Sequence, residues 1–440
     1  MHLTPLEPWI ARKIGIAPEP LTRAAVDAYQ LAKVRETLAW ARTRSPFYAA
    51  HLADAPTDLP SLRAFTAFPF TTPEELRASG LQFLCVSQDA IHRVVTLDSS
   101  GTTGDPKRLY FTKDDQELTI DFFHIGMSTF TDPGDRVLIL LPGERPGSVG
   151  DLLALGLARL GAVGIKHGLV RNPAETLMVM AQERVDGLVG VPTQVLSLAR
   201  QSVESGLQLK SVLLSTDYVP RAIVAELEQI WGCRVYNHYG TTETGLGGGV
   251  DCQARRGYHL READLYVEIV DPATGVPLAE GLTGEVVFTT LTRCGMPLIR
   301  YRTGDLGRFI PGACPCGTVL RTLGWITDRR SNCVPLCGGT LRLSELDEAL
   351  FPIPALLDFS AVLTAGAGRD CLTLEITAMR GSLLEAVSDG ARQALERLPV
   401  IVAALRTKCL DLRVWAHTED PALPPRFGKR TLMDGRTAYG

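Results

Sequence analysis

The sequence predicts an α/β protein. Its large N-terminal domain combines a doubly wound parallel sheet with a β-rich subdomain, and a small α+β domain follows at the C-terminus. Three observations predict this. Short apolar runs recur about every 22–26 residues between 136 and 236, with amphipathic stretches between them, as parallel β-α units require. After about residue 245, Gly-rich turns separate strand-like runs. Beyond about residue 333, helices and strands alternate over roughly a hundred residues, a common size for one domain.

The expected elements follow in this order. The first ninety residues are mainly helical, most clearly over 21–44. Buried strands are expected over 136–141, 162–166, 187–191, 211–215 and 233–236, with helices over 151–160, 194–204 and 221–231. The β-rich part has strand-like runs over 265–270, 284–291, 297–301 and 319–323. The last part has helices over 344–351 and 383–398 and strands over 356–364 and 371–378. The predicted domains are 1–328 and 333–440, with a hinge at about 329–332.

Composition excludes several classes of protein. The 440 residues include 45 Lys plus Arg and 49 Asp plus Glu, which gives a net charge of −4. Such a balance provides no electrostatic footprint for nucleic acid or for an anionic membrane surface. The longest apolar stretch, 152–165, is interrupted by Arg159 and is too short to span a bilayer. The first residues lack the layout of a secretory signal. We therefore expect a cytoplasmic globular protein with no nucleic-acid or membrane partner.

A loop rich in glycine and hydroxyl side chains lies at 99–107. Gly101 and Gly104 permit backbone angles that let successive N–H groups converge on an anion. Lys107 adds a positive charge, and four hydroxyls add hydrogen-bond donors, those of Ser99, Ser100, Thr102 and Thr103. The same residue types also make ordinary surface turns. Composition alone therefore leaves a phosphate-binding loop and a surface turn equally open.

Three later segments carry a resemblance. Tyr239-Gly240-Thr241-Thr242-Glu243 follows an expected strand, Tyr301-Arg302-Thr303-Gly304-Asp305 closes the β-rich part, and Gly428-Lys429-Arg430 lies near the C-terminus. Together with the loop at 99–107, they have the order and rough spacing found in the adenylate-forming enzymes, which include acyl-CoA synthetases, peptide-synthetase adenylation domains and luciferases. Within that superfamily the chain resembles the phenylacetate-CoA ligase family most closely, from about residue 45 to 350 and again at Lys429.

The resemblance implies a role for each motif. The loop at 99–107 closes over the β- and γ-phosphates of ATP, Tyr239 lies against the adenine, Thr242 contacts the α-phosphate and Glu243 holds Mg²⁺. Asp305 accepts hydrogen bonds from both ribose hydroxyls, since a carboxylate has two acceptor oxygens. The implied ATP- and AMP-binding residues are Ser99, Ser100, Gly101, Thr102, Thr103, Gly104, Lys107, Tyr239, Gly240, Thr241, Thr242, Asp305 and Arg329. Positioned cations are needed because a carboxylate that attacks ATP meets negative charge on every side.

The C-terminal part is similar to the family in its lysine and differs from it at the hinge. Lys429 is one of only eight lysines and stands where the family has a mobile catalytic lysine, so the resemblance assigns it a catalytic role with Thr242 and Glu243. The family's hinge has an Arg and two Asp, whereas here the run is Asp328-Arg329-Arg330-Ser331-Asn332. Arg329 keeps the cation and both carboxylates are replaced. The domain rotation that precedes transfer to CoA therefore uses altered contacts.

Four residues suggest a metal site. Cys252 and His259 lie close together in the sequence, and Cys314 and Cys316 follow some fifty residues later. Three thiols and an imidazole can complete a tetrahedral structural Zn²⁺ site. The spacing alone favours ordinary packed thiols. The resemblance favours zinc, because some phenylacetate-CoA-ligase-like members have such a site in these segments.

These observations lead to one predicted function and two rivals. The predicted enzyme uses ATP and Mg²⁺ to convert a carboxylic acid, aromatic as is usual in the family, into an acyl-adenylate and then a CoA thioester. The expected acid pocket includes Ser215, Asn237, His238 and Gly247, and the expected assembly is a homodimer. One rival adenylates an acid but passes the acyl group to an amine or a carrier protein, or transfers a nucleotidyl group. The other is a nucleotide-binding protein without catalysis, against which Lys429 and Glu243 argue.

Overall fold

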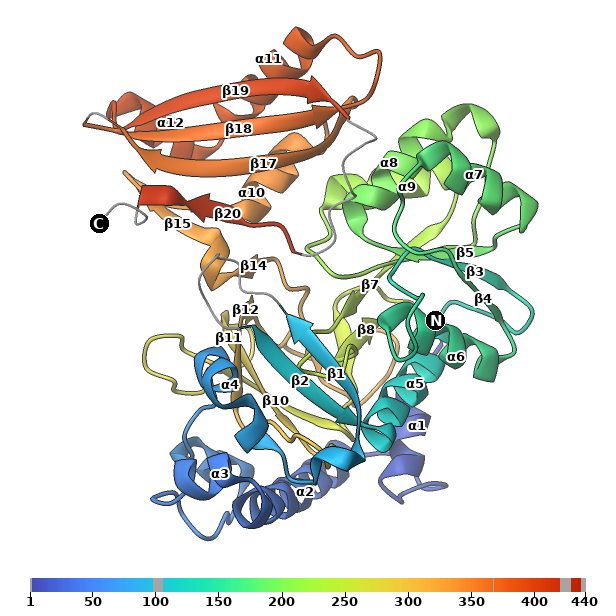
Figure 1. Ribbon diagram of the computed structural model, residues 1–440, viewed down its shortest axis with the longest axis vertical. Coiled ribbons are helices and arrows are strands. Elements are labelled where there is room, and N and C mark those ends of the chain that lie inside the picture. Colours follow the sequence, from blue (N-terminus) through green and yellow to red (C-terminus); the bar gives the residue numbers. More distant parts are fainter. Residues whose placement is uncertain (1, 98–105, 367, 420–428, 437–440) are drawn as a thin grey trace. The chain divides into compact units, whose positions relative to one another are not determined.

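The structure is a computed structural model that describes residues 2–97, 106–366, 368–419 and 429–436 (Figure 1). The chain forms two compact units. Unit 1 comprises residues 1–135, 142–166 and 236–326, and unit 2 comprises residues 136–141, 167–235 and 327–440. The predicted domains, with a hinge at 329–332, stay a prediction. Among the described residues, no helix combines the length and apolar character needed to cross a membrane.

Unit 1 begins with helices whose ends are specified locally. Thr22 caps α2 by accepting a hydrogen bond from the Ala25 N–H, and Thr72 and Glu75 form a reciprocal capping box on α4. α5 and α6 approach closely at Gly156, where a Cβ would lie 2.9 Å from the His124 nitrogen. The helices of unit 1 are α1 Leu6–Lys13, α2 Arg23–Arg44, α3 Pro46–His51, α4 Pro73–Ser79, α5 Lys113–Met127 and α6 Val149–Leu160, with 3₁₀ turns at Leu62–Ala67, Gly80–Phe83 and Gln88–Ala90.

The strands of unit 1 are largely antiparallel. β1 pairs with β2, and the orders β10-β11-β12 and β13-β9-β8-β7 are hydrogen-bonded in two further sheets. A core of buried aromatic and aliphatic side chains, including Tyr48, Phe65, Phe83, Phe288 and Tyr301, packs the N-terminal helices against β10–β12. The strands are β1 Ile91–Leu97, β2 Lys107–Thr112, β4 Val163–Lys166, β7 Arg234–Tyr239 (its first two residues in unit 2), β8 Gly249–Asp251, β9 Tyr258–Leu260, β10 Leu265–Val270, β11 Gly284–Thr290, β12 Tyr301–Gly307 and β13 Thr322–Leu323.

Unit 2 contains the parallel β-α units. β3, β5 and β6 pair in parallel, with Val137 opposite Gly187 and Gly187 opposite Ser211. Their side chains are almost entirely buried, as expected for a strand covered on both faces. Gly232 ends α9 in the left-handed conformation. The elements are β3 Arg136–Ile139, α7 Pro173–Gln182, β5 Gly187–Gly190, α8 Pro192–Gln201, a 3₁₀ turn Val203–Ser205, β6 Ser211–Leu214 and α9 Arg221–Trp231.

The C-terminal part of unit 2 is a small α+β assembly. Its four-stranded sheet has the order β19-β18-β17-β20, and α11 and α12 pack on β19 (Figure 1). A two-stranded hairpin, β15 with β16, leads into α10. The elements are β14 Asp328–Arg329, a 3₁₀ turn Arg330–Asn332, β15 Cys333–Leu336, β16 Gly339–Arg342, α10 Leu343–Leu350, β17 Leu356–Ala365, β18 Asp370–Ala378, α11 Leu384–Leu395, α12 Pro399–Arg406, β19 Leu410–Thr418 and β20 Leu432–Asp434.

One expected strand of the β-rich part is wrong, and another is shorter than expected. The run 297–301 is not a strand, since β12 begins only at Tyr301. Arg300 has a φ of +47°, which interrupts an extended backbone, and its guanidinium is buried against Glu268. The run 319–323 shrinks to Thr322–Leu323.

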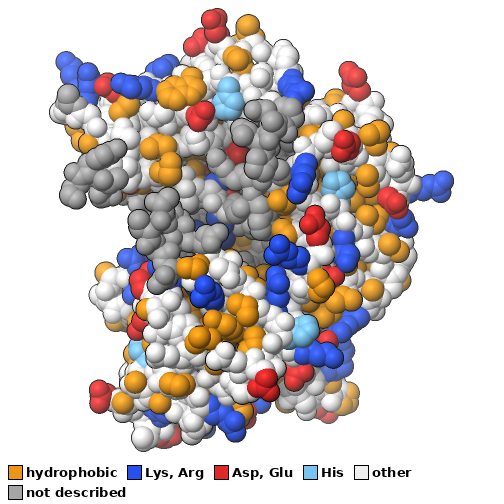
Figure 2. All heavy atoms as spheres, in the orientation of Figure 1, with side chains coloured by type: hydrophobic (Ala, Val, Ile, Leu, Met, Phe, Trp, Pro, Cys, Tyr) orange, Lys and Arg blue, Asp and Glu red, His pale blue; other side chains and the backbone are white. Residues whose placement is uncertain are grey.

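On the face drawn in Figure 2, acidic and basic side chains are interspersed, as the small net charge suggests.

Candidate active site

The turn after β7 is held rigidly by its own hydroxyl groups. The Thr241 N–H donates to the Thr244 Oγ1 at 3.0 Å, and the Thr244 N–H donates to the Thr241 Oγ1 at 3.3 Å. At Gly240 a Cβ would lie 2.5 Å from the Leu246 carbonyl oxygen, so only glycine fits there. The turn therefore fixes the backbone of Thr242 and Glu243, the two residues that the sequence marks for chemistry.

Glu243 is a buried, charged carboxylate. Its Oε1 is paired with the Lys107 Nζ and accepts a hydrogen bond from the Tyr301 hydroxyl at 3.2 Å. Burial alone would raise the pKa of Glu243, but the charge and hydrogen bond of Lys107 lower this pKa to about 2. The pKa of Tyr301 is raised by burial and by the neighbouring carboxylate, so its hydroxyl remains a donor. An ionised carboxylate in this position is the type of oxygen ligand that Mg²⁺ accepts.

Tyr239 and Asp305 form a second part of the same unit. The Tyr239 hydroxyl donates to the Asp305 Oδ2 at 3.0 Å, and the ring packs against Tyr258 with centroids 5.7 Å apart. Asp305 lies on β12 and is fully buried. Gly304 precedes it with a φ of +74°, and the Thr303 hydroxyl accepts from the Asp305 N–H at 3.0 Å. The pair thus joins the end of β7 to β12, and the contacts of these residues with adenine and ribose stay a prediction.

The candidate acid-binding residues of unit 1 lie among aromatic rings. The His238 ring lies 6.2 Å from the Phe122 ring and 6.1 Å from the Phe123 ring. A Cβ on Gly247 would lie 2.4 Å from the Phe122 ring. The Asn237 N–H donates to the buried Asp251 carboxylate at 2.8 Å. Burial and the nearby Arg261 lower the pKa of His238 to about 4, so this imidazole is neutral at physiological pH.

Other predicted residues fall outside this group. Ser99, Ser100, Gly101, Thr102, Thr103 and Gly104 lie outside the described residues. Ser215, Arg329 and Lys429 belong to unit 2. That these three residues act together with the site residues of unit 1 stays a prediction. Within unit 1 the structure brings together Lys107 with Glu243, and Tyr239 with Asp305.

Sequence reasoning missed three residues that support the turn. Tyr301 stood in a quoted motif but was given no role. Arg261 donates to the Thr244 carbonyl and lies over the Phe122 ring at 5.4 Å. Arg293 lies over the Phe111 ring at 4.8 Å and beside Gly245, whose Cβ would lie 3.1 Å from the Arg293 Nη2. Burial lowers the pKa of Arg293 to about 10. Because isolated arginines are ordinary surface residues in a sequence, no local signal identifies these two as buried supports.

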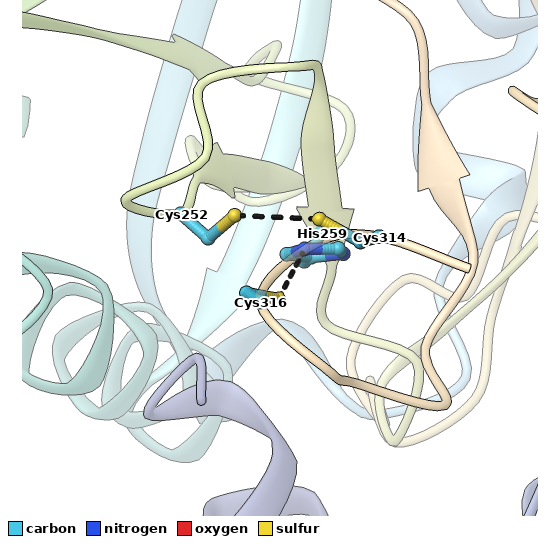
Figure 3. Close-up of side chains that lie close together, drawn as sticks. All are labelled: Cys252, His259, Cys314 and Cys316. Carbon is cyan, nitrogen blue, oxygen red and sulfur yellow. Dashed lines mark hydrogen bonds between the residues drawn. The ribbon is translucent and has the colours of Figure 1, made fainter. Parts of the chain in front are cut away.

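The four predicted metal ligands form one buried cluster, drawn in Figure 3. The Cys252 and Cys314 sulfurs are 3.6 Å apart, the Cys316 sulfur is 3.4 Å from the His259 Nε2, and all four ligand atoms lie within 4.8 Å of one another. Ligands about 2.3 Å from a tetrahedral zinc ion are roughly 3.8 Å apart. A hydrogen bond from Cys252, with a further contribution from His259, lowers the pKa of Cys316 to about 3. The donor types and spacing therefore fit Zn²⁺.

Comparison with known proteins places this geometry in a family. A family model described as AMP-binding enzyme matches residues 83–292. Phenylacetate-coenzyme A ligase of Aromatoleum evansii is 30% identical over 358 residues, which are 77% of this chain and 79% of that protein. The protein of the same name from Thermus thermophilus is 29% identical over 370 residues, 80% of each chain.

Solved structures share the fold. 2-Hydroxyisobutyryl-CoA ligase in the postadenylation state superposes with a TM-score of 0.77 at 21% identity, over 94% of this chain and 90% of that one. An anthranilate CoA ligase in complex with anthranoyl-AMP gives a TM-score of 0.51 at 15% identity, over 75% and 64%. The predicted fold class is confirmed. The chain belongs to the AMP-binding enzyme family, as an AMP-forming acyl-CoA ligase of the phenylacetate-CoA ligase group.

Proposed function

We propose that this enzyme activates an aromatic carboxylic acid, of the size of phenylacetate, and transfers it to CoA. The observation that supports this most is the pairing of the buried Glu243 carboxylate with Lys107, beside the Tyr239–Asp305 hydrogen bond. These residues offer an anionic metal ligand, an aromatic face and a ribose acceptor within one compact unit. The aromatic acid is supported by the rings of Phe122 and Phe123 around His238 and by the names of the relatives.

In the first half-reaction, the acid's carboxylate attacks the α-phosphate of ATP and pyrophosphate leaves. Asp305 and Tyr239 orient the nucleoside, and Thr242 donates to the α-phosphate. Glu243 holds Mg²⁺, which when bound neutralises charge on the phosphates. Lys107 and the segment 99–104 contact the leaving pyrophosphate, with Arg329 as a further phosphate-binding cation. Lys429 donates to the oxygens on which charge develops, which is where a cation accelerates the step.

In the second half-reaction, the CoA thiol attacks the carbonyl carbon of the acyl-adenylate and AMP leaves. The neutral imidazole of His238 and the small Gly247 shape the acid pocket, to which Ser215 and Asn237 also contribute. None of these four residues carries a charge at neutral pH, while the Arg261 guanidinium lies over the Phe122 ring. The proposed pocket selects the aromatic ring of the acid by shape and by stacking.

The zinc cluster has a structural role in this proposal. Three thiols and one imidazole complete the tetrahedron, so no position remains for substrate. The Cys252–His259 segment and the 314–316 loop would be joined by the ion. Its removal is expected to lower stability and to act on catalysis only through the fold.

Pyrophosphate release should be measured over a panel of acids, with and without CoA. Phenylacetate, benzoate and anthranilate test the aromatic class, and acetate and 2-hydroxyisobutyrate serve as aliphatic controls. An aromatic acid should give the highest kcat/KM, and CoA should raise turnover by consuming the acyl-adenylate. A preference for the aliphatic acids would overturn the substrate class. Equal turnover with and without CoA, with every acid, would favour an amine or carrier-protein acceptor.

A variant tests the assignment of Lys429. Lys429→Ala should slow acyl-adenylate formation by roughly 10²–10³-fold, the scale of losing one aimed donor in the transition state. With acyl-adenylate supplied, the same variant should form thioester at close to the wild-type rate. Arg406→Ala, which removes an exposed cation at the end of α12, is the matched control and should change neither step. Wild-type adenylation in Lys429→Ala would remove this lysine from the mechanism.

A further inference from the structure

Arg430, the residue after Lys429, is one of the most buried cations in the described part of the chain, with 4% of its surface exposed. Its two terminal nitrogens donate to both carboxylate oxygens of Asp347 on α10, at 2.8 and 2.9 Å. Its Nε donates to the Asp217 Oδ2 at 3.0 Å. All three residues belong to unit 2. A guanidinium with a bidentate carboxylate partner on one edge and a second carboxylate on another has a fixed orientation.

The surroundings of Arg430 restrain it further. Its guanidinium lies over the rings of Phe351 and Phe359, at 5.0 and 5.3 Å from their centroids. Its backbone is also held, because the N–H donates to the Asp217 Oδ2 at 3.2 Å and the carbonyl accepts from the Asn332 Nδ2 at 3.1 Å. Both peptide groups that flank Arg430 are thus fixed, and the first of them is the peptide bond to Lys429.

The charged residues around Arg430 depend on one another for their stability. Asp358 lies 3.8 Å from the Arg430 Nη1, so three carboxylates face one guanidinium. Burial raises the pKa of Asp347 to about 7, although Arg430 opposes the shift. Removing the cation would leave buried carboxylates without their partner, which is costly. The cluster is therefore a specific structure and not a set of exchangeable surface contacts.

We propose that Arg430 is a positioning residue for adenylation, which Asp217 and Asp347 hold so that the backbone of Lys429 is fixed for the first half-reaction. This inference rests on the proposed role of Lys429. The two carboxylates have different parts. Asp347 and Arg430 both lie within the predicted C-terminal domain, 333–440, so their pair persists when that domain turns. Asp217 lies in the predicted N-terminal domain, so the Asp217–Arg430 contact must break before thioester formation.

Other contacts between the same segments provide a control. The Tyr218 hydroxyl donates to the Glu348 Oε1 at 2.6 Å, and the Arg221 N–H donates to the same oxygen at 3.0 Å. These bonds join the loop before α9 to α10 without touching Arg430 or Lys429. Tyr218→Phe therefore weakens the same interface as Asp217→Asn, but it leaves the lysine segment fully bonded.

The test compares the two half-reactions in the full-length enzyme. Asp217→Asn keeps the acceptor for the Tyr218 N–H, but it places an amide NH2, which cannot accept, where Oδ2 accepts from the Nε and the backbone N–H of Arg430. It should lower kcat for acyl-adenylate formation about tenfold, the scale of one hydrogen bond to a charged group, with the KM for ATP unchanged. Thioester formation from supplied acyl-adenylate should proceed at the wild-type rate or faster. Arg430→Lys should lose more adenylation activity than Asp217→Asn, because an ammonium cannot bond Asp347 bidentately and also reach Asp217.

Three results would overturn the inference while leaving the role of Lys429 intact. Wild-type adenylation in Asp217→Asn, while Lys429→Ala is slow, would show that the contact does not position the lysine. Equal losses in Tyr218→Phe and Asp217→Asn would show that the interface as a whole matters, and not the lysine segment. Equal loss of both half-reactions in Asp217→Asn, together with a lowered melting temperature, would assign the contact to stability. Wild-type adenylation in Lys429→Ala would instead remove the proposed function of that lysine, and the positioning role with it.

Discussion

The Lys107–Glu243 ion pair allows a quantitative prediction. Glu243→Gln keeps the shape of the side chain and its hydrogen-bonding to the Tyr301 hydroxyl but removes the charge. The Lys107 side chain is 15% exposed and the Glu243 side chain 9% exposed, so the remaining ammonium would be left largely buried beside a neutral amide. Breaking a buried pair by removing one partner is strongly destabilising, because the other charge loses its compensation.

The pKa of Glu243 sets the magnitude. It falls from an ordinary value of 4.5 to about 2, and each pKa unit corresponds to about 1.4 kcal/mol, so ionised Glu243 in its whole folded environment, the cost of burial included, stabilises the folded state by about 3 kcal/mol. A carboxylate with a lowered pKa in the folded state stabilises fully above its unfolded pKa. The contribution is then lost as the pH falls from about 4.5 to 2. The wild type should therefore exceed Glu243→Gln in unfolding free energy by 1–3 kcal/mol (an order-of-magnitude estimate) at pH 7, and the difference should shrink below pH 4.5.

Urea unfolding without ATP or Mg²⁺ measures this difference, and a double-mutant cycle with Lys107→Met isolates the pair. Glu117→Gln is the matched control, because its ion pair with Arg159 is about half exposed and should contribute less than about 1 kcal/mol. In adenylation assays, Glu243→Gln should also raise the Mg²⁺ concentration needed for half-maximal rate. Additive effects of the two substitutions, within about 0.5 kcal/mol, would refute the coupling.

Three further predictions concern the metal cluster and the acid pocket. Zinc should copurify at about one ion per chain, and Cys316→Ser should lower both the zinc content and the melting temperature; metal-free protein with an unchanged melting temperature would contradict the site. Neutral His238 stabilises fully above pH 6.5 and loses that contribution toward pH 4, so unfolding free energy should fall less between pH 7.5 and 4 in His238→Gln than in the wild type. Gly247→Ala should displace the Phe122 ring, lower stability by about 1–3 kcal/mol and raise the KM for an aromatic acid more than that for ATP.

Much of the fold could be predicted because its signals are local. Apolar runs of strand length alternate with amphipathic helices from β3 to β7, and every strand and helix expected there lies within a few residues of its place, whereas α7 was not expected. The wrong strand at 297–301 shows where such signals fail. Its apolar side chains are buried in the core, as the pattern suggests. In place of a regular ladder, the Thr71 hydroxyl donates to the Ile299 carbonyl and the Ile299 N–H donates to the Tyr48 hydroxyl. The apolar pattern predicts that these side chains are buried, but it does not predict the conformation of their backbone.

The candidate site likewise has a part that the sequence predicts and a part that it does not. The run Tyr239–Glu243 could be read because its glycine and hydroxyl residues form a turn within five positions. The partner of Glu243 could not, since Lys107 lies 136 residues away and sequence reasoning gave it only a phosphate-binding role. Long-range pairing is decided by how the two segments pack, which no local pattern records.

The role of Arg430 could not be predicted from a sequence motif. In the sequence it is one basic residue beside the predicted catalytic lysine, and a solvated guanidinium is the ordinary expectation for such a residue. In the structure it is buried because Asp217, Asn332 and Asp347, which lie 213, 98 and 83 residues away, converge on it. None of these can change alone without leaving a buried polar group unpaired. A residue that is proposed to contact the substrate can therefore be recognised from a motif. The residue that is proposed to position it can be recognised only from the tertiary structure.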